Sequence, residues 1–116
     1  MNFDTAKSLK EAGFPQTFTD GRYVYLNDGT KILFDKIKQG LDENGKVINY
    51  QTTLISIPTI DELISALGTN LDNIKVTNGT IKVYSTIKDN QNTPLESSKV
   101  TLSDSLSDLY IQVTNI

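Results

Sequence analysis

The sequence predicts an α+β protein of one domain, with three helices packed on an antiparallel sheet of about four to five strands. The expected order is α-β-β-β-α-β-β-α. Three observations lead to this class. Apolar residues recur at helical spacing in three separate segments. Runs of β-branched and aromatic residues lie between those segments. Asn-Gly and Asp-Gly pairs join neighbouring runs, as they do in hairpins. A length of 116 residues fits a single domain.

The first helix is expected over residues 4–12, with Asp4 or Asn2 accepting hydrogen bonds from the free N–H groups of the first turn. Gly13 follows at the position where helices commonly end in a left-handed residue, and Phe14 is placed to seal that end. Pro15 then prevents the helix from continuing.

Three strands are expected next. Residues 22–26 and 31–34 are rich in aromatic and β-branched side chains, and an Asp-Gly turn at 27–29 joins them into a hairpin. A second turn is expected at 42–45, and a third strand within residues 46–57.

The second helix has the clearest signal. Thr59 and Glu62 form a capping box at its start, and Gly68 ends it. Four apolar residues share one helical face: Ile60, Leu63, Ile64 and Leu67.

The last third of the chain contains two more strands and a helix. Strands are expected at about residues 74–77 and 80–87, joined at an Asn-Gly turn. Residues 89–98 hold one Pro and almost no apolar residue, which predicts a loop. Thr101 caps the third helix, whose apolar stripe is Leu102, Leu106, Leu109, Tyr110 and Val113.

The composition removes several chemistries. The chain has no Cys, and therefore no disulfide or thiolate, and no His, and therefore no imidazole base or His metal ligand. Its glycines are too scattered for a phosphate-binding loop. Asp61 and Glu62 are adjacent, but the first turn of a helix accounts for both. We therefore expect no catalytic residue, no metal-ligating residue and no cofactor, and we expect that the protein is not an enzyme.

The charge and the N-terminal sequence bear on partners and location. A net charge of -3 gives no electrostatic reason to bind nucleic acid or anionic lipid. The first residues lack the basic and apolar regions of a signal peptide. The longest apolar stretch, near residues 54–60, is far shorter than the ~20 residues that span a bilayer. A cytoplasmic protein without membrane contact is expected.

The first hairpin carries the candidate interaction surface. Tyr23 and Tyr25 alternate onto one face of the strand. That face either offers stacking surfaces beside basic residues or packs under the helices. The candidate residues are Arg22, Tyr23, Tyr25, Lys36 and Lys38.

Three stretches together carry a resemblance: residues 6–16 (AKSLKEAGFPQ), residues 57–68 (IPTIDELISALG) and the closing helix over 101–113. They resemble a family of small uncharacterised proteins from bacteriophages, prophages and their bacterial hosts. Members carry an N-terminal LKxAGFPQ helix signature, a central PTxxEL helix and a C-terminal amphipathic helix. The resemblance implies a related fold, a phage or mobile-element context and the cytoplasm of a bacterial host. It carries over no catalytic or ligand-binding residue.

These observations favour a small non-enzymatic protein that acts by binding another protein. Self-association is included, because an unpaired sheet edge can template a partner strand. Two alternatives remain: a nucleic-acid-associated accessory factor that uses the first hairpin, and a minor virion component.

Overall fold

The computed structural model describes residues 1–36 and 54–116. Within this part, three α-helices combine with two three-stranded antiparallel sheets. The α+β class is confirmed. The predicted antiparallel sheet of four to five strands is matched only in part, because the strands divide between two sheets, and the predicted order lacks one strand that precedes the last helix. The elements are α1 (Phe3–Glu11), β1 (Tyr23–Leu26), β2 (Lys31–Leu33), β3 (Leu54–Ser56), α4 (Ile60–Leu67), a 3-10 turn (Gly68–Asn70), β4 (Leu71–Thr77), β5 (Thr80–Lys88), β6 (Pro94–Lys99) and α5 (Leu102–Thr114).

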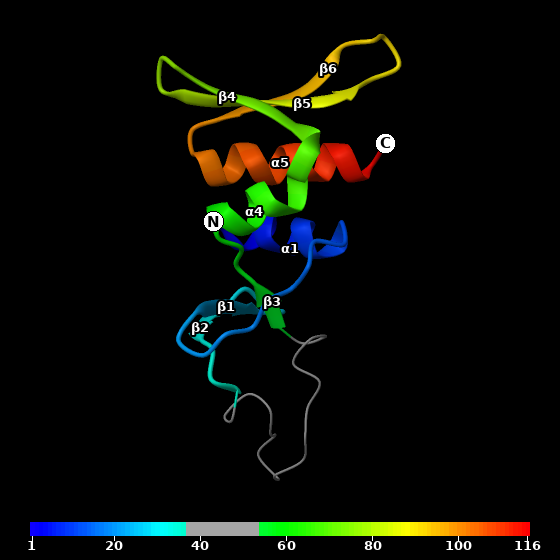
Figure 1. The fold of residues 1–116 in the computed structure, drawn as a ribbon. Helices are drawn as coiled ribbons and strands as arrows, with labels where there is room; N and C mark the ends of the chain where they lie inside the picture. The colour runs from blue at the N-terminus through cyan, green and yellow to red at the C-terminus, as the bar shows by residue number, and fades with distance from the viewer. Residues whose placement is uncertain (37–53) are drawn as a thin grey trace.

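The helices lie between the two sheets. Figure 1 shows the sheet β4-β5-β6 at one end of the molecule, then α5, then α4 with α1, and the sheet β2-β1-β3 at the other end. Helix α1 contributes to both halves of the core. Its Leu9 joins the cluster beneath the second sheet, whereas its Ala6 packs with Tyr25 and Ile55 of the first sheet.

The main core forms where α4 and α5 meet the second sheet. Leu63 of α4, Val83 of β5 and Leu106 and Leu109 of α5 are fully buried in it. Apolar burial of this kind is the main stabilising contribution to a domain of this size. The apolar stripe predicted for the third helix, which is α5, therefore faces the core as expected.

Helix ends follow the predicted capping. Asn2, rather than Asp4, caps α1 by accepting a hydrogen bond from the Thr5 N–H at 2.8 Å. At α4 the capping box is complete: Thr59 Oγ1 accepts from the Glu62 N–H at 3.1 Å, and Glu62 Oε1 accepts from the Thr59 N–H at 2.9 Å. Leu63 and Leu67 are buried, but Ile60 and Ile64, which share the predicted apolar face, remain 41% and 36% exposed.

The predicted hairpins are confirmed. Gly29 has φ +91° in the β1–β2 turn, where Asp28 Oδ1 accepts a hydrogen bond from the Thr30 N–H at 2.9 Å. Asn78 and Gly79 both have positive φ in the β4–β5 turn, as a two-residue hairpin loop requires. Strand β3 lies inside the predicted third strand, but the turn expected at 42–45 lies outside the described residues.

The loop predicted over residues 89–98 is confirmed for residues 89–93 but is wrong for residues 94–98, which belong to β6. A short turn at Asp89 leads directly into β6, which pairs with β5 from Lys88↔Pro94 to Ile81↔Lys99. In that turn the Asp89 carboxylate accepts hydrogen bonds from two backbone N–H groups, at 2.8 and 3.0 Å. The strand contains one large aliphatic residue, Leu95, so it has no apolar alternation for a pattern to detect.

Among the described residues, no helix is both long enough and apolar enough to cross a bilayer.

Candidate interaction surface

The first hairpin presents one exposed apolar pair. Tyr23 of β1 lies directly opposite Leu33 of β2, and the two residues are 56% and 54% exposed. The ammonium group of Lys31 lies 5.1 Å from the centroid of the Tyr23 ring. We call Tyr23, Leu33 and Lys31 the hairpin patch. Directly paired side chains share one face of a sheet, so the patch is one continuous surface.

Tyr25 shares this face but is not on the surface. It is 8% exposed and packs with Ala6 of α1 and Ile55 of β3. Its hydroxyl donates a hydrogen bond to the Met1 carbonyl at 2.8 Å, and its ring meets Phe3 edge-on with centroids 5.5 Å apart. Helix α1 therefore covers one end of this face and leaves the end at Tyr23 open.

The Arg22 side chain is partly buried and binds other parts of the fold. Its Nη2 donates to Glu62 Oε1 at 2.7 Å and to the Ile57 carbonyl at 2.7 Å. The Arg22 side chain is 26% exposed. This ion pair ties the start of β1 to the first turn of α4, so the guanidinium charge is already matched by a carboxylate.

The two predicted lysines have different outcomes. Lys36 is exposed, and its backbone N–H donates to Asp20 Oδ1 at 2.7 Å. Lys38 lies outside the described residues. Of the five predicted surface residues, Tyr23 and Lys36 are therefore exposed, whereas Tyr25 is buried and Arg22 is paired with Glu62.

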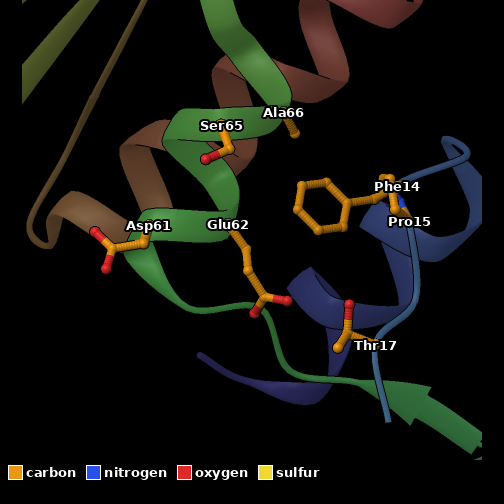
Figure 2. A pocket seen from close by; sticks show the side chains of 7 residues that line it. All are labelled: Phe14, Pro15, Thr17, Asp61, Glu62, Ser65 and Ala66. Atoms are coloured by element: carbon orange, nitrogen blue, oxygen red, sulfur yellow. The ribbon is translucent and has the colours of Figure 1, made fainter.

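A cleft of about 410 Å³ lies beside the Arg22–Glu62 pair. Figure 2 shows the Phe14 ring between the chain after α1 and Ala66 of α4, and the Glu62 side chain extending toward Thr17. The cleft is lined by Phe14, Pro15, Thr17, Asp61, Glu62, Ser65 and Ala66.

The carboxyl group of Glu62 stays ionised down to low pH. Burial raises the pKa of this group, but hydrogen bonds from Arg22, from the Thr59 N–H and from Thr17, together with the Arg22 charge, outweigh that effect. The pKa of Glu62 falls from 4.5 to about 2. A carboxylate held this firmly serves the fold as an ion-pair partner.

Figure 2 shows that the neighbouring Asp61 side chain turns away from Glu62. The two carboxyl groups therefore do not face each other across the cleft, as a paired acid and base would. Among the described residues, no three Asp or Glu side chains gather into a group that could hold a metal ion.

Sequence reasoning missed Leu33. The pairing register sets Leu33 opposite the exposed Tyr23, and Leu33 is exposed as well. The tight Asp-Gly turn was the available signal, because a turn of known length fixes which residues face each other across a hairpin.

Comparisons with known proteins give no relatives. No protein-family model matches the chain, and neither a curated protein nor a solved structure matches it.

Proposed function

We propose that this protein is a non-enzymatic binding protein of phage or mobile-element origin, whose hairpin patch docks onto another protein. The phage context is supported by the three sequence stretches that resemble phage-associated proteins. The binding role is supported by the exposed Tyr23–Leu33 pair, since large apolar side chains that adjoin each other on a surface favour a partner interface.

The partner is expected to combine an apolar contact with a carboxylate. Tyr23 and Leu33 provide the apolar area, and tyrosine is among the residues that dominate binding energy at protein interfaces. Lys31 adds one positive charge beside the Tyr23 ring, where a partner carboxylate would complete an ion pair.

A protein partner is favoured over nucleic acid because fewer cationic and aromatic side chains are available on the first hairpin than its sequence indicated. Arg22 is neutralised by Glu62 and Tyr25 is buried. Tyr23 is the one exposed aromatic side chain of β1 and β2. Proteins that bind single-stranded nucleic acid by stacking instead use successive aromatic side chains along a basic groove.

The experiment compares Tyr23→Ser with Tyr84→Ser. Tyr84 of β5 also has a lysine ammonium over its ring, that of Lys82 at 5.5 Å, but it lies on the second sheet. The partner is recovered from a lysate of the natural host with tagged wild-type protein, identified and purified, and its affinity for each variant is measured by calorimetry. We expect Tyr23→Ser to cost about 2 kcal/mol, or about thirty-fold in affinity, and Tyr84→Ser to leave affinity unchanged.

Equal affinity of both variants for the purified partner would contradict the role of the hairpin patch. The nucleic-acid alternative is tested with single-stranded DNA and RNA. Binding that weakens steeply with salt and is lost in Lys36→Ala and Lys38→Ala would replace the proposal with that alternative.

A further inference from the structure

The second sheet has one covered face and one open face. Figure 1 shows α5 along one side of β4-β5-β6, and no described element lies on the other side. Val83 of β5 is buried in the cluster that includes Leu106 and Leu109 of α5. Because successive side chains of a strand alternate between the two faces of a sheet, Lys82 and Tyr84 belong to the open face.

The open face is polar and carries several lysines. In the central part of the sheet, the outward residues of all three strands are polar apart from the ring of Tyr84. Lys75 of β4 lies directly opposite Lys82 of β5. Lys88 shares the face, because its partner on β6 lies two residues before Glu96, the partner of Tyr84. We call Lys75, Lys82, Lys88, Tyr84 and Glu96 the basic face.

Lysines outnumber carboxylates on the basic face. Its carboxylate, that of Glu96, binds the Lys82 ammonium at 3.2 Å. Among the described residues, neither Lys75 nor Lys88 forms an ion pair. Asp72, the other carboxylate of these strands, lies at the bulge that begins β4. Like charges directly opposite each other destabilise a sheet, so the fold itself gives no reason for Lys75 beside Lys82.

The net charge of -3 conceals the basic face, because a net charge sums over the whole chain. A partner meets one surface at a time, and the charges on that surface set the field that it meets. Lys75 and Lys88 are exposed, and the side chains of Lys82 and Glu96 are 33% and 47% exposed. The basic face therefore presents an excess of positive charge to an approaching anion.

We propose that the basic face binds an acidic polypeptide segment of another protein, whose carboxylates pair with Lys75 and Lys88. Such a segment offsets the repulsion between Lys75 and Lys82 and supplies carboxylates of the charge that the face lacks. Exposed ion pairs contribute little each, so charge complementarity here sets the choice of partner and the speed of association more than the affinity. The inference does not rest on the hairpin patch, which lies on the first sheet.

Single-stranded nucleic acid suits this face less well than an acidic segment does. Proteins that bind it by stacking use successive aromatic side chains. Tyr84 is the one ring of the basic face, and the Lys82 ammonium lies 5.5 Å from its centroid. Arginine, which binds phosphate through two parallel hydrogen bonds, is absent from the face.

A labelled oligoglutamate peptide is the probe, and its binding is measured by fluorescence anisotropy at increasing salt. We expect binding at low salt that weakens as salt is added, because salt screens exposed charges. Lys75→Gln and Lys88→Gln should each raise the dissociation constant about threefold, and the two together about tenfold. Lys7→Gln and Lys31→Gln are the matched controls. Each removes one exposed lysine, from α1 or from β2, and should leave the affinity unchanged.

Glu96→Gln is a sharper test, because it should tighten binding. Its loss frees Lys82 and removes a charge that repels the probe, so we expect the dissociation constant to fall about threefold. A variant that merely unfolds would not bind more tightly.

Three results would overturn the proposal. The first is no binding at low salt, and the second is a loss of affinity in Lys7→Gln or Lys31→Gln as large as that in Lys75→Gln. The third is tighter binding of an oligothymidylate of equal charge, which would assign the face to nucleic acid. Because Tyr23→Ser leaves the basic face intact, binding by this face and by the hairpin patch fail or succeed separately.

Discussion

The Arg22–Glu62 ion pair should make the stability of the fold depend on pH in the acid range. The pKa of Glu62 is about 2 in the folded protein against an ordinary value of 4.5. A carboxyl group whose pKa is lowered by folding stabilises the folded state fully above its unfolded pKa. The contribution of Glu62 is therefore complete above pH 4.5 and is lost as the pH falls from 4.5 to about 2.

The magnitude follows from the difference between these two pKa values. Converting the whole pKa difference into a free energy gives an upper bound of about 3 kcal/mol for the contribution of Glu62 to stability. The side chains of Glu62 and Arg22 are 28% and 26% exposed, so solvent screens part of their interaction. We expect a contribution of about 2 kcal/mol, which is typical of hydrogen bonds to a charged group.

The assay is urea-induced unfolding of the wild type and of Glu62→Gln, at neutral pH and near pH 2. The substitution should lower the free energy of unfolding by about 2 kcal/mol at neutral pH. Near pH 2 the two proteins should have similar stability, because the wild type has by then lost most of the contribution.

Asp61→Asn is the control, because it removes a carboxylate from the same helical turn but leaves the Arg22 ion pair intact. It should cost about 0.5 kcal/mol through the helix dipole. The reasoning is refuted if Glu62→Gln lowers stability equally at both pH values, or by no more than Asp61→Asn does.

Three further substitutions test individual contacts by thermal or urea unfolding. Ser105 Oγ donates to the Ile81 carbonyl at 2.5 Å and accepts from the Lys99 N–H at 3.0 Å, so Ser105→Ala should cost about 2 kcal/mol. Ser97 Oγ is buried without a hydrogen-bond partner among the described residues, so Ser97→Ala should be neutral or stabilise by up to about 1 kcal/mol; a loss as large as that of Ser105→Ala would contradict this. Gly29→Ala should cost about 1 kcal/mol, because an alanine is strained at a φ of +91°. Its new Cβ would lie 3.5 Å from the Phe3 ring, an ordinary contact, so backbone strain alone is tested. An unchanged unfolding midpoint would contradict the strain.

Helix ends and tight turns could be predicted from the sequence because their determinants are local. Thr59 and Glu62 bond to each other across three residues, and Gly79 takes its positive φ inside a two-residue loop. Such contacts need no information about the rest of the chain.

The division into two sheets and the presence of β6 depend on contacts that local patterns do not encode. Residues of β6 are mostly polar because most of that edge strand is exposed, and Ser97 lies where an aliphatic residue would have revealed the buried face. The register with β5 and the tight turn at Asp89, rather than hydrophobic alternation, hold the strand in place.

Which residues of the candidate surface are exposed could be predicted only in part, because long-range contacts decide this as well. Alternation correctly placed Tyr23 and Tyr25 on one face, but only the packing of α1 decides which of them is covered. Arg22 looked like a surface cation because its partner, Glu62, lies 40 residues further along the chain.

The placement of the two sheets along the chain has a kinetic consequence. Strands β4, β5 and β6 and helix α5 follow one another without interruption, so their contacts close short loops. The first sheet instead pairs Val24 with Ser56, and α1 packs against α5 across nearly the whole sequence. Short loops favour early folding. Substitutions in β5 should therefore slow folding, whereas substitutions in β1 should mainly speed unfolding.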